Sequence, residues 1–184
     1  IAEIISRECG GKAHLVGLSL GGSIIYKILE RHPQLVDKAV IDGASAKPIA
    51  GAGFISAGAR MISPFIKFDP VIKIMAGALG VSADGYESFR QSMKSVSPNA
   101  FGRALSQANL ADMDIEKCNF TSPILFISGE KEAEIMHSTH KYLSKKIKGS
   151  KYYIYPGGGH AWMVKDSQTH IRLVKEWLTL ENDN

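Results

Sequence analysis

The pentapeptide Gly17-Leu18-Ser19-Leu20-Gly21 stands between an apolar run, Ala13-His14-Leu15-Val16, and a stretch with helical periodicity over 22–31. A serine with a glycine two residues before it and two residues after it is typical of a sharp turn from a strand into a helix. Such a turn strains the serine backbone, and we expect a Cβ at either glycine to clash. The turn holds the Ser19 Oγ clear of the sheet, so the pattern predicts a nucleophilic serine.

Apolar runs and helical stretches alternate on both sides of this turn. Strands are expected over 13–16, 38–42, 123–128 and 151–155, the last as a half-exposed edge. Helices are expected over 1–9, 22–31 and 135–147, and near the end of the chain. The inward face of that last helix is predicted to hold Ile171, Leu173, Val174, Trp177 and Leu178. This alternation predicts an α/β fold, a mostly parallel sheet with helices on both faces.

Between Ala46 and Cys118 the pattern changes to short apolar helical patches broken by glycine and proline. This segment is too hydrophobic for a linker and lacks a strand-helix unit. We predict an insertion of short helices over the carboxyl edge of the sheet. A final run from Phe101 to Ala111 is expected to return the chain as a crossover helix.

The composition is that of an ordinary globular domain, with 45% hydrophobic and 22% charged residues and a net charge of +4. The densest basic stretch, 145–151, resembles a solvated helix end, so no nucleic-acid partner is expected. No apolar run approaches the roughly 18 residues of a membrane-spanning helix. Cys9 and Cys118 lack metal-type spacing, which favours two free thiols and a cytoplasmic location.

A serine hydroxyl becomes a good nucleophile when a base takes its proton and a third group orients that base. In an open α/β sheet such groups follow the carboxyl ends of strands. His160 follows the fourth strand after three glycines, and an acidic loop follows the third. The order serine, acid, histidine is that expected after such a turn. The residues leave four candidates for the acid: Glu130, Glu132, Glu134 and, less favoured, Asp42.

The remaining five histidines are expected to have structural or surface roles. His137 and His140 lie three apart on a predicted helix, but no third ligand accompanies them, so surface positions are favoured over a metal site. His14, inside the first strand, is expected to be a packed or hydrogen-bonded core residue. His32 and His170 are expected to face solvent. No metal and no cofactor are implied.

Taken together, these motifs resemble those of the α/β hydrolases of the lipase, esterase and acylhydrolase type. Residues 17–22 resemble the nucleophile elbow of that family, 126–132 its acid-bearing loop and 156–160 its histidine loop. The likeness extends from residue 1 to about residue 178. In the family the acid is usually an aspartate three residues after the loop glycine, a position that Glu132 occupies here.

The resemblance implies a triad of Ser19, Glu132 and His160, with the backbone N–H of Leu20 as one oxyanion donor. It also implies a core part over 1–45, a helical cap over 46–109 and a second core part over 110–184. The four expected strands correspond to the last four of the family's sheet. The strands before them, on the order of 60–90 residues, normally carry the loop with the second oxyanion donor. We therefore expect a fragment with an exposed sheet edge, prone to self-association.

The function implied by the resemblance is hydrolysis of a small carboxylic ester or thioester through an acyl-enzyme intermediate. One alternative is a binding or sensing protein that uses the same scaffold for a ligand without turnover. Another is a cap that docks on membranes, because basic residues are interspersed with phenylalanines there: Lys47, Arg60, Lys67 and Lys73 among Phe54, Phe65 and Phe68. A core-facing cap helix explains the same pattern more simply, and is the expectation retained here.

Overall fold

The structure is a computed structural model that describes residues 1–48, 50–79, 81–109, 112–116 and 119–180. Cys9 is exposed and carries a free thiol. The prediction of a free thiol at Cys118 and that of a polar tail over 181–184 lie outside the described residues. No helix of the described chain is long and apolar enough to cross a membrane.

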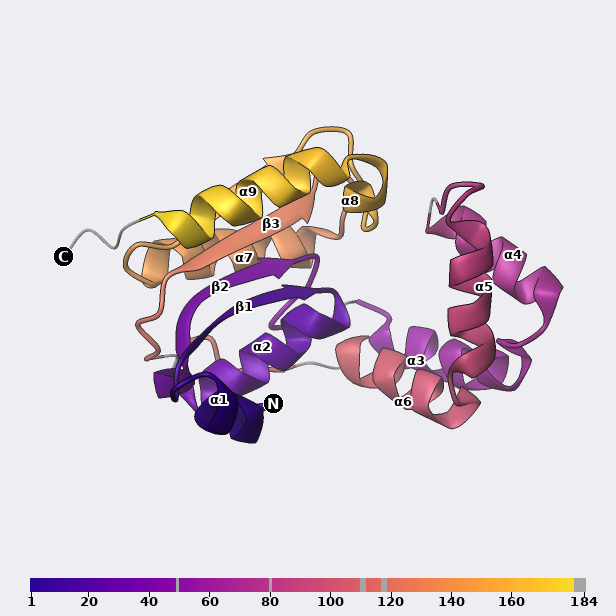
Figure 1. Cartoon of the computed structure of the whole chain (residues 1–184), viewed down its shortest axis with the longest axis horizontal. Helices are drawn as coiled ribbons and strands as arrows, with labels where there is room; N and C mark the ends of the chain where they lie inside the picture. Colours follow the sequence, from indigo (N-terminus) through magenta and orange to yellow (C-terminus); the bar gives the residue numbers. More distant parts are fainter. Residues whose placement is uncertain (49, 80, 110–111, 117–118, 181–184) are drawn as a thin grey trace.

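A single sheet of parallel strands forms the centre of the molecule (Figure 1). It contains β1 (Ala13–Leu18), β2 (Val36–Asp42), β3 (Ile124–Gly129) and β4 (Lys151–Tyr155), hydrogen-bonded in the order β1-β2-β3-β4. The pairing aligns Leu18 with Asp42, and Asp42 with Ile127. The loops that follow these strands therefore leave the sheet side by side. The predicted α/β class with a parallel sheet is confirmed.

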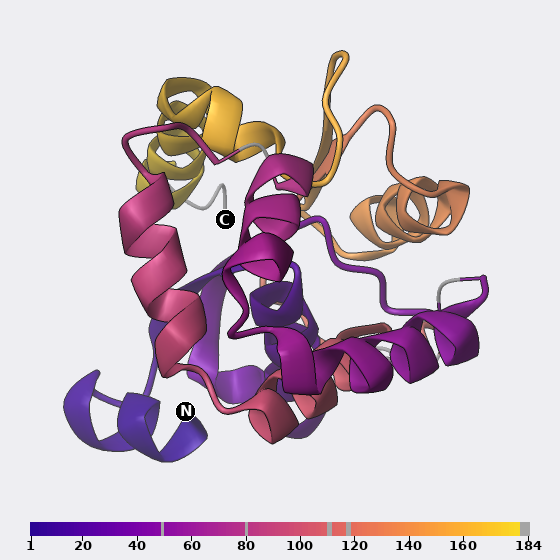
Figure 2. The same cartoon turned by 90° about the vertical axis from the view of Figure 1, so that its right-hand side faces the viewer.

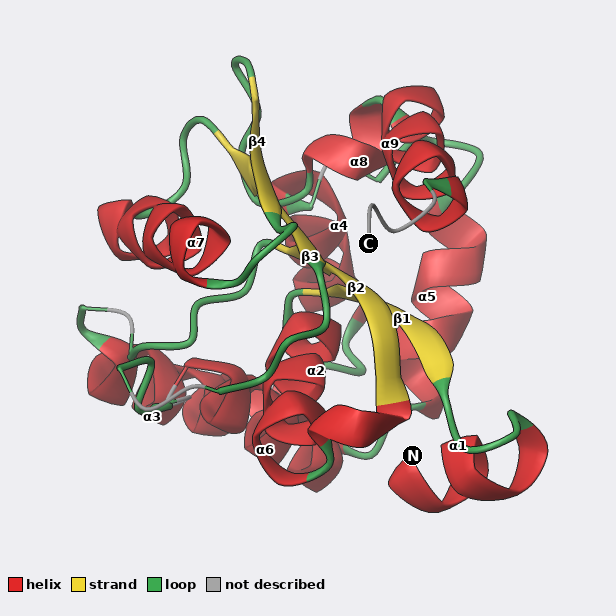
Figure 3. Cartoon of the chain, turned by 90° about the vertical axis from the view of Figure 1, so that its left-hand side faces the viewer, coloured by secondary structure: helices red, strands yellow, loops and turns green. Residues whose placement is uncertain are grey.

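Helices cover both faces of this sheet (Figure 3). The core helices are α1 (Ala2–Glu8), α2 (Leu20–Arg31), α7 (Glu134–Lys146), α8 (Trp162–Lys165) and α9 (Ser167–Thr179). A short 3-10 turn, η1 (Pro33–Leu35), follows α2, because Pro33 cannot continue the helix. Helices α2 and α7 pack on one face, and α8 and α9 pack on the other.

Alternating strand residues fill the two halves of the core, as the two-residue period of a strand requires. Ala39 and Ile41 of β2 face α2 and α7, while Val40 between them faces α8 and α9. On the α9 side the predicted Leu173, Val174, Trp177 and Leu178 pack inward. Ile171 is 50% exposed, so its predicted inward position is wrong. It lies on the flank of the helical stripe that is centred on Trp177.

The exposed face of β1 corrects a second prediction. The side chain of His14 is 39% exposed and its Nδ1 lies 3.4 Å from Asp37 Oδ2, so His14 is not a core residue. Val16 and Leu18, two and four residues further along the same face, are also exposed. Because α8 and α9 pack over β2, β3 and β4, this face of β1 has no cover within the described chain.

The segment between β2 and β3 consists of short helices beyond the carboxyl ends of the strands (Figures 1 and 2). They are α3 (Ala52–Ile62), η2 (Ser63–Phe65), α4 (Asp69–Ala78), α5 (Tyr86–Ser95) and α6 (Pro98–Asn109). A small core of Ile66, Ile72 and Met93 holds them together. Helix α6, predicted as a crossover helix on the sheet, packs mainly on α3. Gly102 of α6 faces η2, directly after α3, and a Cβ there would lie 3.3 Å from Ser63.

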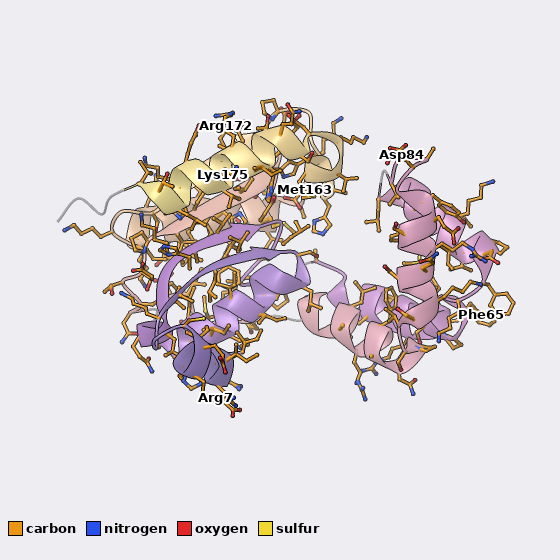
Figure 4. All side chains as sticks on the ribbon, viewed as in Figure 1. Arg7, Phe65, Asp84, Met163, Arg172 and Lys175 are labelled. Carbon is orange, nitrogen blue, oxygen red and sulfur yellow. The ribbon has the colours of Figure 1, made fainter. Side chains whose placement is uncertain are left out.

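The core-facing orientation predicted for the phenylalanines of this insertion is wrong. Phe54 is 89% exposed, Phe65 53% and Phe68 60%. Figure 4 shows Phe65 at the outer end of the insertion, turned away from the sheet. Its ring meets that of Phe68 edge to face, with centroids 6.0 Å apart. Ile66 and Ile72 fill the small core of the insertion instead.

Candidate active site

Ser19 lies at the turn from β1 into α2 in a strained backbone conformation. Its φ of 51° and ψ of −114° make it the one non-glycine residue with positive φ in the described chain. Its N–H donates to the carbonyl of Asp42, at 2.8 Å, and its own carbonyl accepts from Ser23 N, at 3.1 Å. These bonds fix the turn between β2 and the first turn of α2. Strain of this kind persists only where the surrounding structure holds it.

Two glycines make the turn possible, and only one of them, Gly17, is a glycine that the sequence pattern names. A Cβ at Gly17 would lie 2.5 Å from the Gly21 carbonyl carbon, so glycine is required there. A Cβ at Gly21 would meet nothing within 4 Å, which makes the predicted clash at this position wrong. The second required glycine is Gly22, where a Cβ would lie 2.5 Å from Ala44 Cβ. Gly22 faces the loop after β2, whereas Gly21 faces open space.

The turn after β4 carries His160, and its backbone is fastened to the loop after β3. Lys131 N donates to the Gly158 carbonyl at 2.8 Å, and Glu130 N donates to the Tyr155 carbonyl at 3.0 Å. The carboxylate of Glu130 also accepts from Gly157 N, at 2.6 Å. The two loops therefore form one hydrogen-bonded unit, which sets the position of His160 relative to the acidic loop.

Ser19, His160 and Glu132 form a continuous chain of hydrogen bonds. His160 Nε2 lies 2.9 Å from Ser19 Oγ, and His160 Nδ1 lies 2.7 Å from Glu132 Oε1. Glu132 Oε2 accepts from Gly129 N at 3.0 Å, so both carboxylate oxygens are engaged. A carboxylate only accepts, so Nδ1 carries the proton and Nε2 is free to accept from the serine hydroxyl. The structure thus brings together three side chains that the sequence singles out.

The burial and charges around these hydrogen-bonded side chains suit His160 to act as a general base. The Glu132 side chain is 2% exposed and that of His160 is 46% exposed, so the carboxylate is shielded while the ring remains accessible. The hydrogen bond that His160 donates to Glu132 raises the pKa of His160 above its usual value, and partial burial of the ring opposes that rise. An imidazolium formed by proton transfer from Ser19 is therefore stabilised where it forms.

The other acidic candidates lie elsewhere. Glu130 binds the backbone of the His160 turn. Glu134 lies exposed in the first turn of α7. Asp42 is buried, and its carboxylate contacts Trp162 and His170. Burial raises the pKa of Asp42, while the bonds from His170 and Trp162 oppose that rise. Of the four candidates, the structure places Glu132 at His160.

Two histidine predictions are wrong. His140, predicted at the surface, is fully buried, with Nδ1 2.8 Å from Ser128 Oγ and Nε2 2.7 Å from the Ala44 carbonyl. Burial lowers its pKa to about 4. The inward stripe of α7 is Met136, Thr139, His140 and Leu143, a helical spacing visible in the sequence. His170, predicted to face solvent, is 20% exposed and faces Asp42.

The last two histidines have no role at the site. His137 is half-buried, and its Nδ1 lies 2.6 Å from the Tyr152 hydroxyl oxygen. His32 is exposed, as the sequence predicts. In the described part of the chain no group of three or more His, Cys, Asp or Glu side chains is arranged to hold a metal ion.

Two further features adjoin the triad side chains. Leu20 is the first residue of α2, and the first N–H groups of a helix have no partner within the helix, so they can bind an anion. A cavity of about 370 Å³ lies between the end of α4 and the His160 turn. Its lining includes the apolar side chains of Leu79 and Trp162 and the charged side chain of Lys165. The cavity is large enough for a small apolar group beside His160.

Comparison with known proteins assigns the fold. No protein-family model matches the chain, and no curated protein matches it. Among solved structures it is similar to MGS-M2, an α/β hydrolase enzyme from a Medee basin deep-sea metagenome library, with 19% identity and a TM-score of 0.78 over 100% of this chain and 72% of that one.

Two further structures are similar over nearly the same length of this chain. MenH from S. aureus has 16% identity and a TM-score of 0.74, over 96% of this chain and 71% of that chain. The enol-lactonase from Burkholderia xenovorans LB400 has 16% identity and a TM-score of 0.74, over 96% and 69%. The chain has the α/β-hydrolase fold, as its three motifs predict.

Proposed function

We propose that this chain, which has the α/β-hydrolase fold, is a serine hydrolase that cleaves a small carboxylic ester or thioester. The observation that carries the proposal is the hydrogen-bond chain from Glu132 through His160 to Ser19. A fold by itself does not define an activity. The proposed activity therefore depends on the chemistry that these three side chains perform together.

In the first half of the reaction, Ser19 Oγ attacks the acyl carbon while His160 Nε2 takes its proton. The carbonyl oxygen becomes an oxyanion, and the N–H of Leu20 at the start of α2 is the proposed donor to it. His160 then gives its proton to the leaving alcohol or thiol. The bond from the acyl carbon to the leaving group breaks, and an ester between Ser19 and the acyl group remains.

In the second half, water replaces the leaving group and the same residues act in reverse. His160 takes a proton from water, the hydroxide attacks the acyl carbon, and Ser19 recovers its proton as the acid leaves. Glu132 holds the imidazole in the tautomer that both steps need and stabilises the imidazolium. No cofactor takes part in these steps.

The insertion over 46–109 is proposed as a cap and the segments 1–45 and 110–184 as the core. The cavity between the end of α4 and the His160 turn supports this division, since both parts line it. The cavity has a volume of about 370 Å³ and is lined by His160, one of the three proposed catalytic residues. One similar structure is an enol-lactonase, and a lactone is a cyclic carboxylic ester, which supports the proposed substrate class.

A fluorophosphonate probe tests the proposal, because it reacts covalently with an activated serine. We expect the chain to be labelled and, before labelling, to hydrolyse p-nitrophenyl butyrate, and we expect Ser19→Ala to do neither. Ser138→Ala is the matched control, since Ser138 is exposed and its hydroxyl bonds to Ile135 within α7. A folded chain that neither labels nor hydrolyses the ester contradicts the proposal, and ligand binding without turnover would then be tested.

A further inference from the structure

Asp42 is a buried carboxylate that the proposed reaction does not use, yet it touches the turn that carries Ser19. It is the last residue of β2 and is 1% exposed. Its main-chain carbonyl accepts the N–H of Ser19 at 2.8 Å. Asp42 is thus joined through its backbone to the strained turn that presents the nucleophile.

The carboxylate of Asp42 reaches in another direction, toward α8 and α9. Oδ1 accepts from Trp162 Nε1 at 3.3 Å, and Oδ2 lies 3.4 Å from His170 Nε2. Both of these last two atoms are buried, and neither makes a hydrogen bond to a described residue. Leaving buried polar atoms without a partner is costly, so their 3.4 Å contact is the interaction that each has with the other.

Trp162 is the first residue of α8 and lies two residues after His160. The main-chain N–H of Trp162 donates to the Gly159 carbonyl at 3.1 Å, and this bond closes the turn that carries the His160 imidazole. The indole stacks on Tyr155 with ring centroids 4.2 Å apart and meets His170 edge to face at 5.5 Å. The indole N–H also donates to Asp42, and this hydrogen bond joins the His160 turn to the end of β2.

We propose that Asp42 is a positioning residue that sets the distance between Ser19 and His160. Its backbone carbonyl fixes the Ser19 turn, and its carboxylate fixes the His160 turn through Trp162. His170 lies 3.4 Å from the second carboxylate oxygen, Oδ2, which Trp162 does not reach. This inference rests on the proposed hydrolase function, because it concerns the geometry of the same two side chains.

The test compares Asp42→Ala with Asp42→Asn. Asparagine keeps an oxygen that accepts from Trp162 and fills the same space next to His170, whereas alanine removes both contacts. We expect kcat for p-nitrophenyl butyrate to fall at least tenfold in Asp42→Ala with KM unchanged within twofold, and to stay within threefold of the original in Asp42→Asn. Loss of activity in both variants, or in neither, overturns the proposal.

A matched control separates positioning from a loss of stability. Ser122 is also buried and bonds to the Val36 carbonyl at 2.6 Å, at the opposite end of β2. Ser122→Ala should therefore destabilise the fold without changing kcat below its unfolding temperature. If Asp42→Ala and Ser122→Ala lower kcat equally, the role of Asp42 is structural only and the proposal fails.

Trp162→Phe provides an independent route to the same answer, including the case in which Asp42→Ala does not fold. Phenylalanine keeps the aromatic packing and loses the indole N–H. We expect the rate of fluorophosphonate labelling to fall at least tenfold in Trp162→Phe. We expect no further fall in the double variant that combines Trp162→Phe with Asp42→Ala. An unchanged labelling rate in Trp162→Phe overturns the proposal. Labelling of the unaltered chain, and its loss in Ser19→Ala, decides the hydrolase proposal separately.

Discussion

Gly43 lies directly against the imidazole of His160. A Cβ at this position would lie 3.0 Å from His160 Nδ1 and 3.1 Å from Glu132 Oε1. The backbone of Gly43 has a φ of +59°, and its N–H donates to the Ile127 carbonyl at 3.1 Å. The chain leaving β2 therefore forms one wall of the site and touches both ends of the Glu132–His160 hydrogen bond.

Gly43→Ala should lower the fluorophosphonate labelling rate at least tenfold, because the new methyl group displaces His160 or Glu132. The positive φ should also cost on the order of 1 kcal/mol of unfolding free energy. Gly157→Ala is the control, since Gly157 has a φ of +66° and nothing lies within 4 Å of its Cβ position. Equal losses of labelling in the two variants would show that backbone strain, not the contact, is responsible.

Gly17→Ala and Gly21→Ala should differ sharply, although the two glycines are equivalent in the sequence motif. The Gly17 Cβ position is 2.5 Å from the backbone of Gly21, so alanine there should lower the unfolding free energy by about 2 kcal/mol or more. Gly21 has open space and lies in a helix, so its replacement should be neutral or slightly stabilising. Urea unfolding of both variants measures the difference, and equal destabilisation would contradict the structure.

Glu132→Gln should lower kcat by about three orders of magnitude, because the amide no longer stabilises the imidazolium or fixes its tautomer. Glu130→Gln is the matched control from the same loop. Its side-chain oxygen can still accept from Gly157 N, so kcat should change by less than about threefold. Steady-state kinetics with p-nitrophenyl butyrate provides both values. A larger effect at Glu130 would mean that the acid has been assigned wrongly.

The labelling rate should rise with pH through the pKa of His160, because only the neutral ring takes the proton of Ser19. The bond to Glu132 raises that pKa above its ordinary value of 6.5, so the midpoint should lie above 6.5 and move down in Glu132→Gln. The raised pKa also contributes stability that is present below pH 6.5 and is lost as pH rises through the folded-state pKa. Labelling rates from pH 5 to 9 test the first statement.

His140 should make the protein sensitive to acid. Its folded-state pKa of about 4 lies below the ordinary 6.5, so between these values the unfolded chain binds the extra proton. Stability present above pH 6.5 is lost as the pH falls toward 4, by on the order of 3 kcal/mol. Urea unfolding from pH 7 to 4 measures the loss. The loss of unfolding free energy between pH 7 and 4 should be smaller in His140→Gln. It should be unchanged in His32→Gln, because His32 is exposed.

Local sequence patterns are sufficient to place the strands and the order of the chemical groups. Apolar runs bounded by glycine place β1 to β4 within about two residues of their ends, because buried parallel strands have a local signature. Gly17 before Ser19 and the glycines before His160 mark turns at the ends of strands in the same way. These strands and turns can be predicted because they depend on residues that are close together in the sequence.

Packing between distant segments selects which residues meet across the fold. The residues alone leave Glu130, Glu132 and Glu134 open and the family spacing favours Glu132, while the register of the loop after β3 against the His160 turn brings Glu132 to His160. His140 is buried because its helix face meets the sheet, and His170 is partly buried because it faces Asp42. Phe54 is exposed because the insertion has a core of its own. The helical spacing on α7 indicates an inward face, but which partners each of these side chains meets depends on how elements distant in the sequence pack.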